Sequence, residues 1–588
     1  MTTRPPLQPL SSRFGSLPSL GALLVGAASL TGLPACDAAP PRGCPGTEIF
    51  LDGECVQPHM IRLNSVGYLP ARAKLASYVG DETSFRVLAK DGKVAFKGRA
   101  TTEVSARDSG ERVRIADFSE LEEPGEYHIE VPGVGRSPDF RIGDDVFHDP
   151  LVASMLALYG QRCGTAVELQ WGEATFKHAA CHQKEAGLDY IDGEEGTKDA
   201  SGGWHDAGDY GKYTVNGAFA VAFLLQAYED FPERLKDVEL PIPERGGSTP
   251  DILDEARFQL EWLLKMQLPD GSAAHKVTAR NFEGNIMPEA DEAPQFFVPA
   301  GTAATGTFAA TLALAARVYE PFDPDFAATC LEAAQQAFDF LLENRENLTP
   351  NQSAFTTGAY EAAGYDDERA WAAAELWETT GDPAALEEFE LLASELELTM
   401  LLNFDWSNST NLALATYLRS EREGRDADLV ESIRATTLST AGSLVENWQR
   451  HGYGRSIDTI YYWGINGVLV RTAFNLVAAH RLDPDPKYLD AITGQLDHVF
   501  GRNPYGRSYV TGIGYRPPRF PHHRPSMMSG RFPWPGLLIG GPHSELFSDS
   551  AADVPEGLTW EDRAENYIHN EVAINWNTAL VYALVAAE

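Results

Sequence analysis

The chain is short of positive charge. Of its 588 residues, 47 are Lys or Arg and 85 are Asp or Glu, which gives a formal net charge of −38. This balance repels nucleic acid and anionic lipid, so we expect no nucleic-acid partner, and it suits a neutral or cationic ligand. The simplest interpretation is an acidic surface that keeps an exported protein soluble.

Long apolar runs are also scarce. One run near the N-terminus, "LGALLVGAASLTGLPA", follows Arg4 and Arg13 and has the length of a signal-peptide core, not of a membrane span. It ends in "LPAC", which resembles the lipobox of bacterial lipoproteins, although Pro34 is unusual in that motif. We therefore predict a signal peptide over residues 1–36 and an exported protein, either secreted or anchored to the bacterial cell envelope by a lipid on Cys36.

Cysteine is rare, with six residues in the chain. Cys44 and Cys55 bracket a short turn-rich loop, and in an oxidising compartment we expect them to pair. Cys330 lies at an apolar helical spacing, which is typical of a buried core residue. Cys163 and Cys181 need a separate explanation, given below.

The composition and the hydrophobic pattern of the sequence differ between regions of the chain. Residues 37–58 are rich in Pro and Gly and are predicted to form a linker. Residues 59–146 contain short β-rich runs separated by Gly, Pro and Asp, which favours a small β-sandwich. Residues 147–588 carry about twelve helical stretches, some amphipathic and some apolar nearly all round. That alternation fits a closed double ring of helices, and it equally describes an irregular α-domain.

The segment "GGWHDAGDYGKY" sets Asp206 and Asp209 three positions apart in a Gly-rich loop, directly after His205. Two such carboxylates repel each other unless water, a cation or a proton lies between them, so the pair is suited to gripping and deprotonating a water molecule. The alternative is that the loop only caps the following helix.

Two C-terminal segments carry further polar groups. In "WEDRAENYIHNEVAINWNTA", Glu571 precedes an apolar helix, where desolvation would keep a carboxyl protonated as a general acid requires; the alternative is a capping Glu. In "SYVTGIGYRPPRFPHHRPS", His522, His523 and Arg524 lie in a Pro/Gly-rich loop that could present donors to substrate hydroxyls. That loop could also be a zinc-binding pair or a plain basic loop.

Together these three segments resemble glycoside hydrolase family 9, the cellulase family built on an (α/α)6 barrel. The resemblance covers residues 147–588, and "IRLNSVGYLP" with the β-rich segment after it looks like the N-terminal immunoglobulin-like module of one bacterial branch. The resemblance implies a mainly α protein, with an (α/α)6 barrel over 147–588 and an immunoglobulin-like β-sandwich over 59–146. The matching motif positions are Ser508, Val510, Thr511, Gly514, Arg516, Pro521, His522, Arg524, Trp560, Asp562, Tyr567, Glu571, Ala573, Asn577 and Thr578.

The resemblance also implies roles for individual residues. Asp209 would be the general base, Asp206 would help to hold the water, and Glu571 would be the general acid. Such a pair works by inversion, with acid and base roughly 6.5–9.5 Å apart. The remaining predictions place His522 and Asp562 among the catalytic residues, and Arg524, Trp463 and Tyr567 among the substrate-binding residues.

Metal sites are predicted in two places. Cys163, Cys181, His182 and His205 make an S2N2 set suited to structural zinc, and some relatives with the immunoglobulin-like module carry such a site. His178 is a substitute for the fourth ligand, and a Cys163–Cys181 disulfide is the alternative. By resemblance, Asp367 and Glu368 could bind calcium, although acidic residues that open a helix are more often plain N-terminal charges.

The sequence thus predicts an exported, monomeric, inverting endo-β-1,4-glucanase that acts on cellulose-like or mixed-linkage β-glucan. One alternative is an exo-acting β-glucosidase or glucosaminidase of the same fold, with the long segments 270–300 and 525–560 as walls of its cleft. Another is a non-catalytic carbohydrate-binding lipoprotein.

Overall fold

The structure is a computed structural model, and it describes residues 49–51, 54–56, 60–106, 108–361, 364–457, 461–530, 532–544 and 554–588. The predictions of a signal peptide, of a lipid on Cys36 and of a Cys44–Cys55 pair lie outside these residues or their described side chains. Within the predicted linker, β1 (Ile49–Leu51) and β2 (Glu54–Val56) pair as an antiparallel hairpin. In the described part of the chain, no helix is both long and apolar enough to cross a membrane.

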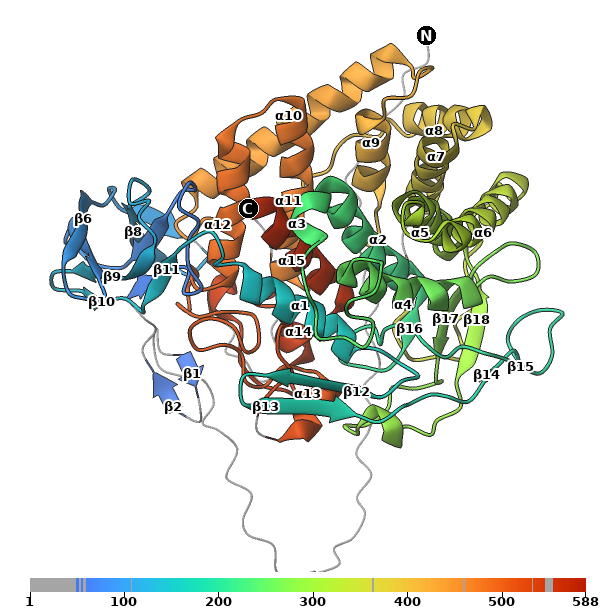
Figure 1. Ribbon diagram of the computed structural model, residues 1–588, viewed down its shortest axis with the longest axis horizontal. Coiled ribbons are helices and arrows are strands. Elements are labelled where there is room, and N and C mark those ends of the chain that lie inside the picture. The colour runs from blue at the N-terminus through green and yellow to red at the C-terminus, as the bar shows by residue number, and fades with distance from the viewer. Residues whose placement is uncertain are drawn as a thin grey trace, which may run out of the picture. The chain divides into compact units, whose positions relative to one another are not determined.

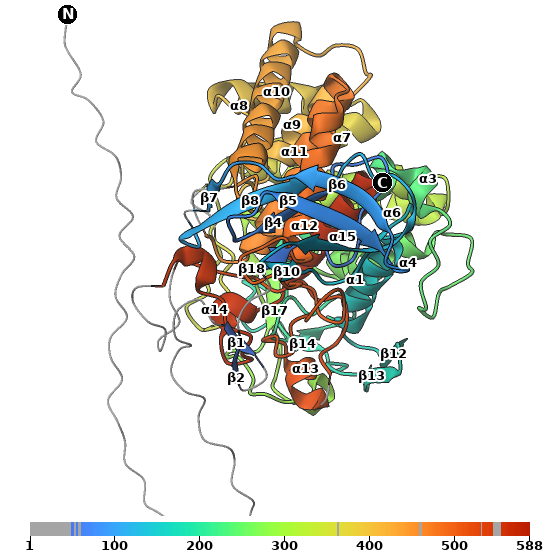
Figure 2. The ribbon, with the colours of Figure 1, turned by 90° about the vertical axis from the view of Figure 1, so that its left-hand side faces the viewer.

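Residues 60–142 form two antiparallel sheets, which Figure 2 turns toward the viewer. One sheet has the strand order β3-β4-β8-β7, and the other has the order β10-β9-β5-β6 with β11 also paired to β9. Alternate side chains of β5 and β9 in one sheet and of β4 in the other point into a common apolar core, as the period of a half-buried strand requires. The strands are β3 (Ile61–Arg62), β4 (Leu75–Tyr78), β5 (Ser84–Ala89), β6 (Val94–Arg99), β7 (Val104–Ala106), β8 (Glu111–Asp117), β9 (Gly125–Val131), β10 (Gly135–Arg136) and β11 (Phe140–Ile142).

Twelve long helices follow among the described residues, together with the short helices α3 (Pro232–Leu235), α13 (Arg524–Ser529) and α14 (Tyr567–Asn570). Six long helices are buried on nearly every side and pack in the cyclic order α2-α5-α7-α9-α11-α15-α2. Between α9 and α11 the ring is joined by a hydrogen bond from Asn411 Nδ2 to Asn475 Oδ1 at 2.8 Å. These inner helices are α2 (Thr214–Asp230), α5 (Thr302–Tyr319), α7 (Asp366–Thr380), α9 (Thr410–Arg419), α11 (Ile465–Leu482) and α15 (Ile574–Ala587).

The other six long helices lie outside this ring and pack against its members. Several are amphipathic, such as α4, whose Leu253, Ala256, Leu260 and Leu263 are all buried as the predicted stripe requires. Figure 1 shows α2, α11 and α15 in the middle of the helical domain and α6, α8 and α10 at its periphery. The outer helices are α1 (His148–Gly160), α4 (Asp251–Lys265), α6 (Pro324–Glu343), α8 (Pro383–Glu395), α10 (Ala427–Arg450) and α12 (Pro486–Val499).

Two small sheets lie at one end of the helical domain. β12 (Val167–Trp171) and β13 (Ala174–His178) form a hairpin, and a five-stranded sheet has the order β15-β14-β18-β17-β16. Its strands β14 and β18 are parallel, whereas its other pairs are antiparallel. The bounds are β14 (Ala186–Gly187), β15 (Thr197–Lys198), β16 (Lys212–Tyr213), β17 (Ala274–Thr278) and β18 (Phe296–Ala300).

Charged side chains near the C-terminal ends of the inner helices form a cluster, which we call the ionic ring. Arg317 of α5 binds Glu229 of α2 at 2.6 Å and Glu375 of α7 at 2.8 Å. Asp230 of α2 accepts hydrogen bonds from Arg481 of α11 and from the Tyr582 hydroxyl of α15, at 2.7 and 2.6 Å. All six inner helices contribute to the ring, whose members are Glu229, Asp230, Arg317, Glu375, Arg419, Arg481 and Tyr582.

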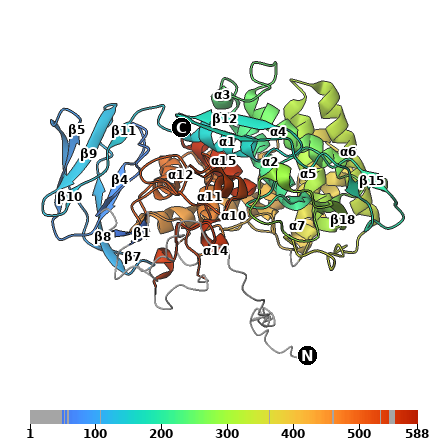
Figure 3. The same cartoon turned by 90° about the horizontal axis from the view of Figure 1, so that it is seen from below.

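The sandwich contacts the helical domain through polar and close-packed groups, and Figure 3 shows its strands beside the helices. Asp108 accepts hydrogen bonds from His451 Nε2 and Arg455 Nη1, both at 3.1 Å, and from the Tyr461 hydroxyl. Gly452 allows close approach, because a Cβ at this position would lie 2.7 Å from a methyl group of Val113.

Candidate active site

A cleft of about 790 Å³ opens at the end of the helical domain where the inner helices begin. The segment before each inner helix supplies part of the lining. The lining residues lie between 206 and 213 before α2, at 282 before α5, at 358–360 before α7, at 405–406 before α9, at 462–463 before α11, and at 522, 524, 567, 571 and 573 before α15. Residues that are far apart in the sequence therefore meet in one groove. Seven predicted site residues line it, namely Asp206, Asp209, Trp463, His522, Arg524, Tyr567 and Glu571.

Asp206 and Asp209 lie on a tight turn that is fixed from several sides. Asp206 accepts hydrogen bonds from Asn216 Nδ2 at 2.7 Å and from the Tyr360 hydroxyl at 2.5 Å. Asp209 accepts from the Tyr213 hydroxyl and from a backbone N–H, each at 3.0 Å. The following helix α2 has no side-chain cap, so the alternative of a mere capping loop is not what the structure shows.

The turn also needs its glycine. A Cβ at Gly208 would lie 2.4 Å from the carbonyl oxygen of His522, which is closer than real Cβ atoms come to a backbone atom. The bare backbone at Gly208 therefore lets the aspartate turn and the histidine loop touch.

Burial perturbs both aspartates. Both carboxyl groups are nearly inaccessible to solvent. Burial, with the charge of Asp209 second, raises the pKa of Asp206 to about 7. Burial likewise raises the pKa of Asp209, against the opposing charge of Arg524. Since both carboxyl groups are buried close together, the two aspartates keep their protons to a higher pH than ordinary aspartates do.

Glu571 faces the same cleft from the strand-like segment before α15. Its Oε2 accepts a hydrogen bond from the indole N–H of Trp463 at 3.2 Å. Desolvation first, and then the charges of Asp209 and Asp206, raise the pKa of Glu571 to about 8. The α15 helix begins after Ala573 with no side-chain cap, so Glu571 does not cap the N-terminus of this helix. At neutral pH its carboxyl is mostly protonated and can donate a proton.

The histidine loop supplies a neutral imidazole. His522 Nδ1 donates to the carbonyl oxygen of Ala564 at 2.7 Å, which leaves Nε2 as the acceptor of a neutral ring. Burial lowers the pKa of His522, so the ring stays neutral at pH 7. Its backbone N–H donates to the carbonyl of Asn570 at 2.8 Å, which joins this loop to the segment that carries Glu571.

Arg524 lines the cleft, but most of its donors point to the protein. Its Nη1 donates to the Gly208 carbonyl at 2.6 Å, and its Nε lies 2.7 Å from a carboxylate oxygen of Glu283. Its Nη2 donates to the Glu283 carbonyl at 3.0 Å. The side chain predicted to bind sugar hydroxyls thus mainly holds the aspartate turn against the segment around Glu283.

Asp562 is the one predicted catalytic residue that does not line the cleft. Its carboxylate accepts from Arg507 Nη2 at 2.9 Å and from the backbone N–H groups of Arg519 and Phe520 at 2.9 and 3.0 Å. These bonds fasten the loop that leads to His522. The structure thus places Asp562 beside the cleft and not in its lining, a direction that a motif match does not reveal, and its catalytic role stays a prediction.

Aromatic side chains that sequence reasoning did not identify line much of the remaining wall. Phe282, Tyr360, Trp406, Tyr462 and Trp576 all contribute to it, beside the predicted Trp463 and Tyr567. Tyr360 is notable for its backbone φ of 48°, a left-handed conformation that aims its hydroxyl at Asp206. It lies in a loop without periodicity, so no sequence signal marked it.

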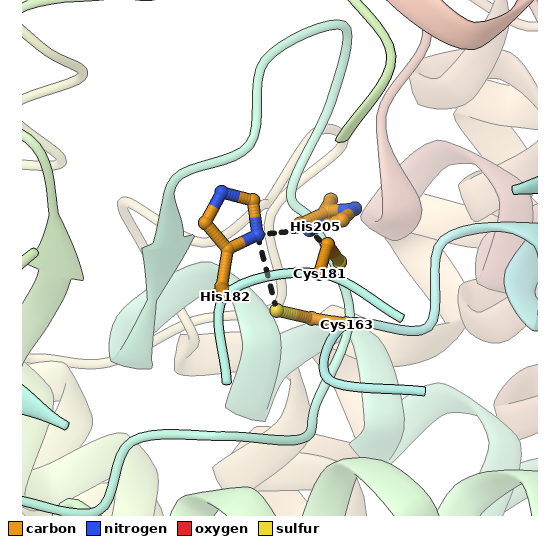
Figure 4. Close-up of side chains that lie close together, drawn as sticks. All are labelled: Cys163, Cys181, His182 and His205. Atoms are coloured by element: carbon orange, nitrogen blue, oxygen red, sulfur yellow. Dashed lines mark hydrogen bonds between the residues drawn. The ribbon is translucent and has the colours of Figure 1, made fainter. Parts of the chain in front are cut away.

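A second cluster lies directly beside the aspartate turn. The ligand atoms of Cys163, Cys181, His182 and His205 all lie within 4.8 Å of one another, and this is the one such converging group found in the described part of the chain. Both thiols are free, so the disulfide alternative is not realised. Figure 4 shows the His182 ring facing the Cys163 sulfur and the His205 ring. His178 stays outside the group and its Nδ1 bonds to the Ala179 carbonyl.

The cluster fits zinc in chemistry and in spacing. Tetrahedral bonds of about 2.0–2.3 Å place neighbouring N and S ligands about 3.3–3.8 Å apart. The distances are 3.4 Å between His205 Nε2 and His182 Nδ1, 3.6 Å between Cys163 Sγ and His182 Nδ1, and 3.8 Å between Cys181 Sγ and His205 Nε2. His205 immediately precedes Asp206, so a metal here would clamp the base of the aspartate turn.

The calcium prediction finds less support. Asp367 accepts hydrogen bonds from the Ser409 N–H and hydroxyl at 2.6 and 3.2 Å, and burial raises the pKa of both Asp367 and Glu368. Calcium takes six to eight oxygen ligands, and no third acidic side chain converges on this pair among the residues described. Calcium at this position stays a prediction and enters no step below.

Comparison with known proteins gives a consistent result. The profile described as "Glycosyl hydrolase family 9" matches residues 147–584, and "Cellulase N-terminal ig-like domain" matches residues 57–136. "Endoglucanase D" of Acetivibrio thermocellus is 45% identical over 527 residues, which cover 89% of this chain and 82% of that protein. Two solved structures are each 35% identical with a TM-score of 0.84. One is a metagenome-derived glycoside hydrolase family 9 endoglucanase, covering 90% of this chain and 99% of its own. The other is a Zn-binding triple mutant of the family 9 endoglucanase J30, covering 88% and 99%.

These likenesses confirm the predicted fold class, a mainly α barrel preceded by an immunoglobulin-like sandwich. The cleft, the three desolvated carboxyl groups and the matched family profile agree with one another over the same residues. The chain therefore belongs to glycosyl hydrolase family 9.

Proposed function

We propose that the protein is an inverting endo-β-1,4-glucanase acting on cellulose-like or mixed-linkage β-glucan. The observation that carries the proposal is a single cleft that presents a protonated Glu571 and the buried Asp206–Asp209 pair. An inverting hydrolysis requires one carboxyl to protonate the leaving oxygen and another to activate a water molecule on the opposite face of the sugar. The endoglucanase relatives support the same substrate class.

In this mechanism Asp209 removes a proton from the attacking water. Asp206 holds that water, and its own orientation is fixed by Asn216 and Tyr360. The Tyr213 hydroxyl and a backbone N–H hold the Asp209 carboxylate, so little reorganisation is needed when the water is deprotonated.

Glu571 protonates the glycosidic oxygen as the bond to the leaving sugar breaks. Its high pKa keeps the proton available at neutral pH, and the Trp463 indole holds the carboxyl in place. His522, with Nε2 as an acceptor, binds a sugar hydroxyl near the cleavage point.

The aromatic wall provides flat apolar faces for pyranose rings. Trp463 and Phe282 are 44% and 49% exposed although they line the cleft, so their rings are free to stack on a sugar. A groove lined in this way along several loops suits a chain of sugars.

Zinc is proposed as a structural ion held by Cys163, Cys181, His182 and His205. Bound there, it would supply cross-linking of the polypeptide, with no part in the chemistry. The backbone already joins residues 161–163 to residues 203–205, through hydrogen bonds from the Cys163 N–H to the Gly203 carbonyl and from the His205 N–H to the Gln161 carbonyl.

Export, the lipid on Cys36 and a monomeric state are proposed on sequence grounds. Export and the lipid agree with the signal-like N-terminus, and export agrees with the net charge of −38.

The decisive test is a product and viscosity profile on carboxymethylcellulose, mixed-linkage glucan, chitosan and cellodextrins. We expect viscosity to fall much faster than reducing ends appear, and the first product to be the α-anomer. A purely exo-acting enzyme would leave viscosity nearly unchanged, a retaining enzyme would release the β-anomer, and a non-catalytic binder would release no sugar.

A further inference from the structure

The segment from Arg280 to Asp291, which we call the strap, has contacts at both ends that the mechanism does not use. Its C-terminal end reaches the Cys/His cluster and its N-terminal half reaches the aspartate turn. In between, the Tyr210 hydroxyl donates to the Ile286 carbonyl at 2.6 Å. The strap therefore connects the aspartate turn with the Cys/His cluster, and Tyr210 contacts it between these two ends.

At the cluster end, Asp291 contacts a predicted metal ligand. Its Oδ2 lies 3.1 Å from His182 Nε2, while the other ring nitrogen, Nδ1, faces Cys163 and His205. This bond fixes the tautomer in which Nε2 carries the proton and Nδ1 has its lone pair free for a metal. Asp291 is itself held, because its Oδ1 accepts from the Ala293 N–H at 3.0 Å.

At the cleft end, Glu283 forms a buried ion pair with Arg524. Both side chains are less than a tenth exposed, and the Nε to Oε1 distance is 2.7 Å. The same Oε1 accepts from the Tyr210 N–H at 3.1 Å, one residue after Asp209. Arg524 in turn donates to the Gly208 carbonyl, one residue before Asp209. Glu283 thus braces the turn on both sides of the proposed base.

We propose that the strap couples the metal site to the aspartate turn, with Asp291 as a positioning residue for His182 and Glu283 as a positioning residue for Arg524 and Asp209. Phe282 belongs to the strap and lines the cleft, so the same coupling extends to the cleft wall. The kinetic part of this proposal rests on the proposed function, whereas the metal-binding part does not.

The first test measures zinc affinity, by competition with a chromophoric chelator, for the full-length wild type and for the variants Asp291→Ala, Glu283→Gln and the double variant. We expect Asp291→Ala to bind Zn²⁺ about 10–100-fold more weakly, because loss of a hydrogen-bond partner of a ligating histidine typically weakens metal binding by this factor. Glu283→Gln touches no ligand, yet we expect weaker binding as well, by about threefold. The matched control is Glu292→Ala, an exposed carboxylate beside Asp291, which should bind as the wild type does.

Wild-type affinity in Asp291→Ala, or in Glu283→Gln, would overturn the proposal, and neither result depends on any enzymatic activity. Circular dichroism identifies a variant that fails to fold. In that case Asp291→Asn and Glu283→Asp, which keep an oxygen near its place, supply the same comparison.

The second test is a kinetic cycle on β-glucan at saturating zinc. We expect Glu283→Gln to lower kcat/KM by about 10–100-fold, mainly through kcat, because the base is misplaced. If the two sites are coupled, the factor by which kcat/KM falls in the double variant is at least about threefold smaller than the product of the factors for the two single variants. Strictly multiplicative losses would overturn the coupling. If the wild type releases no sugar from glucan, the proposed function fails, and the zinc affinities still decide on the strap.

Discussion

Three carboxyl groups share one cleft, and each is pushed by burial toward its protonated form. Asp206 and Glu571 have pKa values of about 7 and 8, and the pKa of Asp209 is also raised. Their roles are separated by their neighbours. The aspartates accept hydrogen bonds from Asn216, Tyr360, Tyr213 and a backbone N–H, whereas Glu571 accepts one from Trp463. The more donors a carboxyl accepts from, the more its ionised form is favoured.

The first prediction concerns Glu571→Gln. Activity of the wild type should fall as pH rises through about 8, because the acid must be protonated, and as pH falls below the pKa values of the aspartate pair, because the base must be ionised. The variant should lose at least about a hundredfold in kcat and should no longer show the loss near pH 8. A pH–rate profile checks this, and a variant with full activity would remove Glu571 from the mechanism.

The raised pKa of Glu571 should also make the stability of the fold depend on pH. A carboxyl whose pKa is raised on folding binds its proton more tightly in the folded state, so the protein loses stability as pH rises from about 4.5 toward 8. Glu571→Gln removes this penalty. We expect its thermal midpoint to exceed that of the wild type at pH 8 and to match it at pH 4.5, and equal midpoints at both pH values would contradict the desolvation of Glu571.

Tyr360→Phe is the third prediction. Removing the hydroxyl deletes one of the two side-chain bonds to Asp206, so the pKa of Asp206 should rise further and the acid limb of the pH profile should move to higher pH. We expect kcat to fall by about tenfold. Tyr190→Phe is a suitable control, since this ring packs on Phe355 and does not line the cleft. An unshifted acid limb would show that Tyr360 does not act on Asp206.

The sequence motifs predicted the residues whose chemistry is distinctive. Asp206, Asp209, Glu571 and His522 could be placed because charged or titratable groups in short irregular loops have few structural uses. Tyr360, Asn216 and Glu283 could not, because a tyrosine, an asparagine or a glutamate looks the same wherever it points. Arg524 and Asp562 were placed at the site, but the direction of their hydrogen bonds depends on loops whose conformation has no sequence period.

At the scale of the helices, the two ends of the barrel differ in chemistry. The segment before each inner helix lines the cleft, while the ionic ring joins the other ends. Arginine at these C-terminal ends also suits the negative end of the helix dipole. Although burial alone would raise it, the pKa of Glu229 is lowered to about 2 by Arg317 and Arg419. The stability this gives is present above about pH 4.5 and is lost as pH falls toward 2.

Arg317→Met is the prediction at this scale. It leaves the partly buried Glu229 and the buried Glu375 short of a cation, so we expect a loss of about 3–5 kcal/mol in the free energy of unfolding, measured by urea denaturation. The kcat on glucan should stay close to the wild-type value, because the ring lies at the end away from the cleft. Lys236→Met, which breaks the exposed ion pair with Glu233, should leave the midpoint of urea denaturation unchanged. An equally small effect of Arg317→Met would show that the ring does not hold the barrel together.

Periodicity was enough to predict about twelve helices, and the structure has twelve long ones among its described residues. It could not distinguish a closed ring from an irregular α-domain, because closure depends on contacts such as Asn411 with Asn475 that lie 64 positions apart. The short strands β14 to β18 also escaped prediction. Strands β14, β15 and β16 have two residues each, too few to show an alternation, and the five residues of β17 are all buried, so they do not alternate either.

At the scale of the whole molecule, the sandwich supports the cleft through Asp108. Its carboxylate binds Tyr461, which is followed directly by the cleft residues Tyr462 and Trp463. Burial alone would raise the pKa of Asp108, but the hydrogen bond from His451 and the charge of Arg455 lower it below its ordinary range. The contact is therefore kept at neutral pH and is lost only in strong acid.

We accordingly expect Asp108→Ala to lower kcat on glucan by about 10–100-fold, since displaced Trp463 would no longer hold Glu571. The same substitution should lower the thermal midpoint. Asp139→Ala is the matched control, because Asp139 is an exposed carboxylate of the sandwich that pairs with the exposed Arg136. Unchanged kcat in Asp108→Ala would mean that the sandwich serves stability alone.

The opposite placement of the cleft loops and the ionic ring has a practical consequence for engineering. The side chains that line the cleft come mainly from connections at one end, and the charged side chains that join the inner helices lie at the other. The connection 402–408, which lines the cleft but bonds to none of the three carboxyl groups in the described part of the chain, can therefore be exchanged with that of a relative to test whether it alters glucan preference, while the opposite end preserves the scaffold.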